Sequence, residues 1–282
     1  MIVARSVAEV RDLVSSERKQ RNTIGFVPTM GALHAGHMSL VRLAKDATDI
    51  VVMSIFVNPL QFGPNEDFER YPRTEEADLA MAQAEGADIV FLPNVQEMYP
   101  AGATTTIHMT GLTDVLEGAH RPGHFDGVAT VVAKLFNIVQ PDLAFFGQKD
   151  AQQVAVIRKM VADLDIPVQV VVGDTVREPD GLALSSRNRY LSETERTRAL
   201  ALYLALEAGA AALRAGEAPS AAEQAMAGIL DGEVEVDYAV AVDPDTFSGA
   251  PAGDVLLAIA GRVGATRLID NMLVRSSERG TA

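Results

Sequence analysis

The stretch FVPTMGALHAGH, residues 26–37, joins a predicted strand to a predicted helix. The apolar run Ile24–Val27, which overlaps its start, is typical of a buried strand. A proline and a glycine interrupt this run, and an apolar pattern with helical spacing begins near Gly36. His34 and His37 therefore lie where a strand is followed by the N-terminus of a helix.

This junction suits an anion. Backbone N–H groups at a helix N-terminus favour negative charge, and Gly36 allows a phosphate to approach closely. The two imidazoles would add hydrogen-bond donors to a phosphate, or to the charge that develops as a phosphate bond breaks. For the pair alone, two other interpretations stay open: solvated loop histidines and a zinc site. Zinc is the weaker of these because the chain has no cysteine and no obvious third ligand.

The composition limits the class of protein. The chain has 282 residues, 48% of them hydrophobic, and a net charge of −14. Its length suggests about two domains, and its acidity argues against a nucleic-acid partner, because a phosphate backbone needs an excess of Lys and Arg. No apolar run approaches the roughly 20 residues of a membrane span. With no signal-peptide pattern and no cysteine, we expect a cytoplasmic protein without a membrane partner.

Strand-like and helix-like segments alternate over the first 175 residues. Strands are expected at 23–27, 50–57, 88–92, 104–108, 143–146 and 168–172. Helices are expected to begin at a capping box, Ser6–Glu9, and at Thr74, with Gly86 ending the second one. Asp126 is expected to cap a further helix, Val128–Val139. The alternation predicts an α/β fold with a doubly wound, Rossmann-like parallel sheet, which binds ligands at the carboxyl ends of its strands.

The pattern changes after about residue 190. Capping boxes at 192–195 and 220–223 each precede an Ala-rich helix, and strand-like runs follow at 234–242, 255–260 and 266–273. We therefore expect two domains. Residues 1–175 would form the Rossmann-like domain that binds the ligands, and residues 176–282 a smaller α+β domain that forms a lid.

Several strand ends carry polar groups. Asn58 and Gln61 follow one strand, Lys149 follows another, and Ser185, Ser186 and Arg187 lie on a glycine-containing loop near the domain boundary. A second loop-to-helix junction, 117–128, contains Gly, His and Arg and is another candidate anion pocket. Each segment alone is also consistent with an ordinary turn or linker. Their occurrence at successive strand ends of one α/β domain favours a ligand site.

Together these segments closely resemble the pantoate–β-alanine ligase family, the pantothenate synthetases of vitamin B5 and coenzyme A synthesis. The resemblance rests on PTMGALHAGH (28–37), SIFVNPLQFGPNEDFERYPR (54–73), RPGHFDGVATVVAKLFNIVQPDLAFFGQKD (121–150) and VREPDGLALSSRN (176–188). These motifs follow the family's order and include the HxGH signature of the nucleotidyltransferase superfamily. The region beyond residue 200 matches less distinctively.

The resemblance implies a homodimeric, AMP-forming ligase with ATP, pantoate and β-alanine as its small-molecule partners. Pantoate and ATP would give pantoyl adenylate and pyrophosphate, and β-alanine would then displace AMP to give pantothenate. Mg²⁺ would accompany ATP, and Asp78 is the candidate ligand for it. Acids in the first turn of a helix also commonly just complement the helix dipole, so that alternative stays open for Asp78.

The resemblance also implies roles for individual residues. The implied catalytic residues are His34, His37, Lys149, Ser185, Ser186 and Arg187. The implied ATP-binding residues are Met30, His37, Gly147, Lys149, Asp150, Val176, Leu184, Ser185 and Arg187. The implied pantoate-binding residues are Met30, Asn58, Gln61 and Gln153, and Glu117 and Arg121 are weaker candidates for the site.

Two residues depart from the family's pattern. Ala151 stands where the family commonly has Tyr, and Leu184 replaces the commoner Met. Neither change removes a proposed catalytic group, and Leu for Met nearly conserves volume. The alternatives are another nucleotidyltransferase, acting on a phosphorylated acceptor, and a non-catalytic ATP-binding module.

Overall fold

The structure is a computed structural model that describes residues 1–64, 66–249, 251 and 253–280. Asn65, within the second of the four motifs, lies outside the described residues. The chain divides into two compact units. The first unit comprises Met1–Thr110, Arg121–Gly147 and Val156–Asp174, and the second comprises Gly111–His120, Gln148–Ala155 and the chain from Thr175 on. Two short internal segments thus belong to the second unit, and the lid role expected for residues 176–282 stays a prediction.

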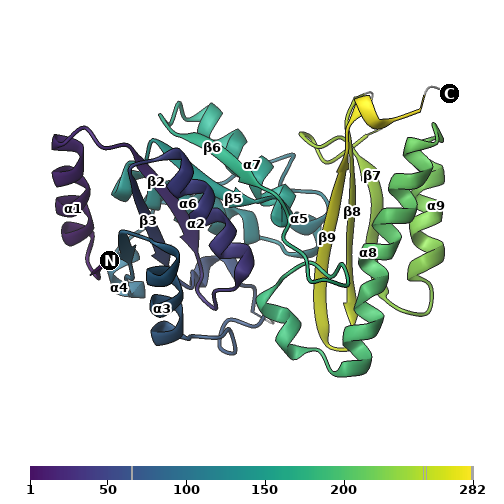
Figure 1. Ribbon diagram of the computed structural model, residues 1–282, viewed down its shortest axis with the longest axis horizontal. Coiled ribbons are helices and arrows are strands. Elements are labelled where there is room, and N and C mark those ends of the chain that lie inside the picture. Colours follow the sequence, from purple (N-terminus) through teal and green to yellow (C-terminus); the bar gives the residue numbers. More distant parts are fainter. Residues whose placement is uncertain (65, 250, 252, 281–282) are drawn as a thin grey trace. The chain divides into compact units, whose positions relative to one another are not determined.

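The first unit contains a parallel six-stranded sheet (Figure 1). Its strands are β1 (Ile2–Ala4), β2 (Ile24–Thr29), β3 (Ile50–Ile55), β4 (Ile89–Phe91), β5 (Leu143–Gly147) and β6 (Gln169–Gly173). They lie in the order β1-β4-β3-β2-β5-β6, so the direction of winding reverses between β2 and β5. The carboxyl ends of strands beside such a reversal are where ligands bind in this architecture. The Rossmann-like fold predicted from the sequence is confirmed.

Helices cover both faces of this sheet (Figure 1). The helical elements of this unit are α1 (Val7–Lys19), α2 (Ala35–Ala47), α3 (Glu75–Glu85), α4 (Val95–Met98), α6 (His124–Val139), the 3-10 turn η1 (Pro59–Gln61) and residues 156–163 of α7 (Ala151–Asp163). On one face, α2 buries Met38 and Val41 against Val27, Met53 and Phe145. On the other face, Phe136 of α6 contacts Phe26 and Phe146 edge-on, with ring centroids 6.5 Å and 6.4 Å apart. Apolar side chains on both faces explain why the strands read as continuous apolar runs.

The second unit is built on an antiparallel sheet of β7 (Glu235–Val242), β8 (Val255–Val263) and β9 (Thr266–Val274), in the order β7-β8-β9. Helices α8 (Glu193–Arg214) and α9 (Pro219–Leu230) pack on one face, which carries Leu257 and Ile259. The opposite face, with Leu256 and Ala258, packs against residues 112–116 and the start of α7 (Ala151–Asp163). The unit also holds α5 (Glu117–His120) and the 3-10 turns η2 (Gln148–Asp150), η3 (Ser186–Tyr190) and η4 (Ser276–Glu278). Alternate residues of β8 thus pack into two different hydrophobic cores, one on each face of the sheet.

Some local predictions were wrong. Residues 104–108 belong to neither sheet, because α6 side chains take up backbone N–H groups there: the N–H of Ile107 donates to Thr130 Oγ1 at 2.9 Å. Helix α6 begins at His124 rather than at Asp126, whose carboxylate instead accepts from the N–H of Met109. The edge strand β1 was not predicted at all.

The predicted helix caps had mixed outcomes. The capping boxes at Ser6 and Ser192 are confirmed. Thr74 precedes α3 without a side-chain cap, although Gly86 ends that helix in the left-handed conformation as predicted. The third box is wrong: α9 begins at Pro219, and its Glu223 accepts a hydrogen bond from the N–H of Ala241 instead. Because its carboxylate is bound to β7, Glu223 does not accept a hydrogen bond from the backbone at the start of α9.

Within the residues that the structure describes, no helix is long and apolar enough to cross a membrane.

Candidate functional site

The loop between β2 and α2 winds around a buried carboxylate. Gly31 and Ala32 both have positive φ, +83° and +50°, and this turns successive N–H groups to one side. The N–H groups of Ala32 and Leu33 donate to the two oxygens of Asp78, at 3.0 Å and 2.8 Å. A Cβ on Gly31 would lie 3.0 Å from Asp78 Oδ2, so the turn requires glycine. Asp78, from α3, thereby shapes residues 30–37, which we call the histidine junction.

His34 and His37 cap α2 through their own rings. Nδ1 of His34 accepts from the N–H of Gly36 at 3.2 Å, and Nδ1 of His37 accepts from the N–H of His34 at 3.3 Å. The rings lie against each other with centroids 4.1 Å apart. Because both Nδ1 atoms accept, the proton of a neutral ring sits on Nε2 in each case. The predicted position of the histidines at a helix N-terminus is confirmed, and in each neutral ring the N–H donor is Nε2.

Met30, Asn58 and Gln61 form a second cluster in the first unit. Gln61 Nε2 contacts the sulfur of Met30 at 3.1 Å, and Asn58 Nδ2 donates to Gln61 Oε1 at 3.1 Å. Asn58 is buried and also donates to the carbonyl of Gly127 at 3.0 Å. Its own oxygen accepts from Tyr99 Oη at 2.7 Å. The amide of Asn58 is therefore used in holding Gln61, while among the described residues the N–H group of Gln61 donates to a weak acceptor, the sulfur of Met30.

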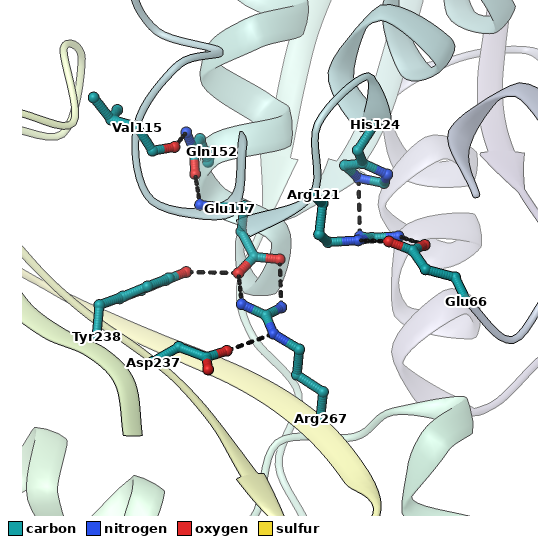
Figure 2. Close-up of polar contacts among 9 residues, drawn as sticks. All are labelled: Glu66, Val115, Glu117, Arg121, His124, Gln152, Asp237, Tyr238 and Arg267. Carbon is teal, nitrogen blue, oxygen red and sulfur yellow. Dashed lines mark hydrogen bonds and ion pairs between the residues drawn. The ribbon is translucent and has the colours of Figure 1, made fainter. Parts of the chain in front are cut away.

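Arg121 and His124 lie on the second loop-to-helix junction (Figure 2). Arg121 forms a two-point ion pair with Glu66, at 2.8 Å and 2.6 Å. His124 Nδ1 donates to the carbonyl of Gln61 at 2.8 Å, and its Nε2 lies 3.1 Å from Arg121 Nη1. Burial raises the pKa of Glu66, but the hydrogen bonds and charge of Arg121 outweigh it and hold this pKa below its usual value. The cation predicted for an anion pocket is thus already paired with a carboxylate.

Lys149 of the second unit lies on η2, directly after β5 in the chain. Its Nζ lies 3.5 Å from Asp150 Oδ1. The carbonyl oxygens of Gln148 and Lys149 accept from Asn271 Nδ2 on β9, at 3.0 Å and 2.8 Å. We call residues 148–150 the lysine segment. Gln153 follows it, half-buried in the first turn of α7.

Residues 176–190, the serine–arginine segment, form a small hairpin followed by η3. The N–H of Leu184 donates to the carbonyl of Val176 at 3.0 Å. Ser185 caps η3, accepting from the N–H of Arg187 at 3.2 Å. Gly181 has a φ of +100°, and a Cβ there would lie 2.1 Å from the ring of Tyr203, so this turn also requires glycine. The segment has internal order, and its predicted mobility stays a prediction.

Glu117 belongs to a separate buried network (Figure 2). Arg267 binds both its oxygens, at 2.6 Å and 2.8 Å, and also Asp237 at 2.7 Å. Tyr238 donates to Glu117 Oε1 at 2.9 Å, and Gln152 Oε1 accepts from the N–H of Glu117 at 3.0 Å. Burial, with the neighbouring carboxylates, raises the pKa of Tyr238 above its usual value. These bonds give Glu117 a structural role in joining α5 to the sheet.

The predicted site residues thus fall into two sets, one in each unit. The first unit brings together Met30, His34 and His37 on the junction and Met30, Asn58 and Gln61 in the amide cluster, and Gly147 ends its strand β5. The second unit carries Lys149, Asp150, Gln153, Val176, Leu184, Ser185, Ser186 and Arg187. Sequence reasoning missed Tyr99, Arg177, Asp270 and Asn271, which hold these residues in place. Arg177 lies within the fourth motif but has no role assigned from it, and Tyr99, Asp270 and Asn271 lie outside all four motifs, with partners that are distant in the sequence.

Asp78 was the predicted Mg²⁺ ligand, and this role stays a prediction that the geometry does not favour. Both of its oxygens already bind backbone N–H groups, and the residue is 3% exposed. Among the described residues, no group of three or more His, Asp or Glu side chains is placed to hold a metal ion. Mg²⁺ commonly binds through substrate phosphates and water with few protein ligands.

The reversal point of a parallel sheet and the histidine-capped helix that follows β2 define an α/β protein with a Rossmann-like fold and a helix N-terminus suited to an anion such as phosphate. The chain belongs to the pantoate–β-alanine ligase family, whose model matches residues 2–273. It therefore catalyses the ATP-dependent condensation of pantoate with β-alanine to pantothenate, through pantoyl adenylate, with release of AMP and pyrophosphate. This conclusion confirms the resemblance found in the sequence.

Relatives match along nearly the whole chain. The pantothenate synthetase of Acidobacterium capsulatum is 56% identical, covering 96% of both proteins, and that of Moorella thermoacetica is 52% identical, covering 99% of this chain and all of its own. The crystal structure of the Thermus thermophilus pantothenate synthetase superposes with a TM-score of 0.92 at 48% identity, covering 96% of this chain and 99% of its own. The Francisella tularensis ligase, complexed with beta-gamma ATP and β-alanine, superposes with a TM-score of 0.82 at 36% identity, covering 97% of each chain.

Proposed function

We propose that His34 and His37 bind the phosphates of ATP while a pantoate carboxylate oxygen attacks the α-phosphorus. The bond from that phosphorus to the bridging oxygen breaks, and pyrophosphate leaves. The observation that carries this proposal is the cap geometry: both Nδ1 atoms accept backbone bonds, so each neutral ring has its proton on Nε2. Together with the N-terminus of α2, these donors suit the developing charge.

In the second unit, we assign Lys149, Ser185, Ser186 and Arg187 to the charge on the reacting phosphoryl group. Lys149 supplies a point charge, and Arg187 a planar fork of donors that matches phosphate oxygens. Gly147 and Asp150 would lie against the ribose of ATP, and Val176 and Leu184 would contribute to the remainder of the nucleotide site. The backbone bond between Val176 and Leu184 supports this assignment, because it brings both ends of the hairpin together beside Ser185.

Pantoate is assigned to Gln61 and Gln153, with Met30 against its dimethyl carbon. Gln61 donates to a sulfur atom in this structure, a weak acceptor that a carboxylate or hydroxyl oxygen would readily replace. Asn58 would act through Gln61, since its own amide is engaged by Gln61, Gly127 and Tyr99. The β-alanine amine then attacks the acyl carbon of the adenylate, loses a proton, and displaces AMP.

Four further properties belong to the same proposal. Mg²⁺ would travel with ATP, bound mainly by phosphate oxygens and water. Two copies of the chain would form a homodimer. Residues 176–282 would act as a lid during turnover, and the protein would work in the cytoplasm. Metal titration of exchange activity tests the first of these, sedimentation the second and cell fractionation the fourth.

The decisive experiment is pantoate-dependent exchange of labelled pyrophosphate into ATP, without β-alanine. Exchange should require pantoate, because an acyl adenylate must form for the reaction to reverse. Gln61→Ala should raise the pantoate KM far more than the ATP KM, because it removes a polar partner of only one substrate. Gln96→Ala, an exposed glutamine on α4, is the matched control and should leave both constants unchanged. Exchange that ignores pantoate, or ADP as the product, would overturn the proposal.

A further inference from the structure

Two adjacent residues of β9, Asp270 and Asn271, are buried although both are polar, with exposures of 3% and 6%. Successive side chains of a strand point to opposite faces of its sheet. Asp270 shares its face with Leu268 and Val274, which belong to the core under α8 and α9. Asn271 shares its face with Leu273, which packs in the opposite core. The pair therefore reaches both sides of the sheet from one point of the strand.

On one side, Asn271 holds the lysine segment. Its Nδ2 donates to the carbonyl oxygens of Gln148 and Lys149, and its Oδ1 accepts from Gln148 Nε2 at 3.3 Å. All the polar atoms of the Asn271 side chain are thus used on two consecutive residues. Two carbonyls held by one amide fix the orientation of the backbone from which the Lys149 side chain leaves.

On the other side, Asp270 holds the serine–arginine segment through Arg177. The guanidinium binds both oxygens of Asp270, at 2.6 Å and 2.9 Å. It also donates to the carbonyls of Gly181, at 3.1 Å, and of Asn271, at 3.3 Å. The ring of Tyr203 on α8 lies under the cation, 4.7 Å away. Arg177 therefore connects the turn of the hairpin directly to β9.

We propose that Asp270 and Asn271 are positioning residues, which set Lys149 and the Ser185–Arg187 group relative to each other for attack on the α-phosphorus. The inference rests on the proposed function, which assigns both segments to the phosphoryl group. Residues from two distant parts of the chain are fixed to neighbouring residues of one strand. A side chain held by a buried supporting residue stays in its productive position, whereas a displacement of about 1 Å can cost about 10²-fold in rate.

The first test is a double-mutant cycle between Asn271→Ala and Lys149→Ala, read by pantoate-dependent pyrophosphate exchange. Asn271→Ala alone should lower the kcat of exchange by about 10- to 100-fold and leave the pantoate KM unchanged. In the Lys149→Ala background the same substitution should have little further effect, because its contribution acts through Lys149. Arg177→Lys, which keeps the charge but loses the two-point fork, should behave in the same way in a cycle with Arg187→Ala.

Leu268→Ala is the matched control. It removes a buried side chain from the same strand and face as Asp270, and it should lower stability without lowering the kcat of the folded protein. Circular dichroism confirms that each variant is folded under assay conditions. If Asn271→Ala does not fold, hydrogen exchange on the folded Asn271→Ser protein replaces that arm. Faster hydrogen exchange confined to the lysine segment supports the positioning role, and unchanged protection of that segment overturns it.

The outcomes separate the inference from the proposed function. Suppose that Lys149→Ala and Arg187→Ala lower exchange, but Asn271→Ala or Arg177→Lys still has its full effect in the corresponding double variant. The positioning role is then wrong and the proposed function stands. If Lys149→Ala and Arg187→Ala leave exchange at the wild-type rate, the proposed function of these segments fails and the positioning role fails with it. If Leu268→Ala lowers kcat as much as Asn271→Ala, the effect is one of general stability and the inference is overturned.

Discussion

The histidine junction of the first unit is held in place by residues close to it in the sequence. The lysine segment and the serine–arginine segment of the second unit are held by residues far from them in the sequence. His34 and His37 are oriented by backbone groups within three residues of themselves, with Asp78 supporting the preceding turn. Lys149 and the hairpin around Gly181 are instead held by residues about ninety or more positions later, on β9. Local hydrogen bonds form wherever their sequence forms a helix, whereas distant ones exist only when the whole unit is folded. The two regions should therefore respond differently to substitution.

The largest expected effect is on the stability of the second unit. Arg177→Ala leaves the buried Asp270 carboxylate without its cation, and removing one partner of a buried pair costs about 3–5 kcal/mol. Burial already raises the pKa of Asp270, and Arg177 opposes this rise, so the carboxylate depends on its partner. Urea unfolding measures the loss. Arg198→Ala, which breaks an exposed pair with Glu233, should cost less than about 1 kcal/mol, and equal losses would remove the contrast.

The next effect separates capping from catalysis at the histidine junction. His34→Asn keeps a side-chain acceptor at the N-cap of α2 but loses the imidazole donor. Pyrophosphate exchange should fall by about 10²-fold, the scale for one lost transition-state donor, while the unfolding free energy stays nearly constant. His34→Ala should lose the same activity and, in addition, about 1 kcal/mol of stability. Wild-type exchange by a folded His34→Asn protein would contradict the phosphate role.

Asp78→Asn tests the one distant support of that junction. The substitution keeps a single acceptor oxygen and turns an amide donor toward a backbone N–H group, so one buried N–H loses its partner. The expected cost is about 1–3 kcal/mol of unfolding free energy. Activity should fall less than in the His34 variants if Asp78 only shapes the turn. A loss of metal dependence with unchanged stability would instead support the predicted Mg²⁺ role.

The smallest effect concerns pH and the ion pair of Glu66 with Arg121. The pKa of Glu66 in the folded protein lies below its usual value of 4.5, so the pair stabilises the protein fully above that pH. The contribution disappears as the pH falls through the lower, folded-state pKa. Wild type should exceed Glu66→Gln in stability by about 1 kcal/mol or less at pH 7, and the difference should vanish in acid. A difference that grows as the pH falls would mean that the sign of the shift is wrong.

Much of the fold and part of the site could be predicted from the sequence. Buried parallel strands read as apolar runs, and Gly86, Ser6 and Ser192 mark helix ends by their own chemistry. The segment 104–108 shows where this fails. Its residues favour a strand, but a strand needs a partner, and α6 instead binds the N–H of Ile107 through Thr130 and that of the following Met109 through Asp126.

By itself, the sequence determined the strand–turn–helix unit at the histidine junction, the family, and hence the reaction. These follow from interactions between residues close together in the chain and from motifs that occur in the family's order. Only the tertiary structure decided that Asn58 holds Gln61, that Arg121 is paired with Glu66, and that Asp270 and Asn271 hold two separate segments. The physical reason is that a buried polar group must find a partner, and the nearest one in space is set by how strands and helices pack. The spacing of residues along the chain does not reveal which partner that is.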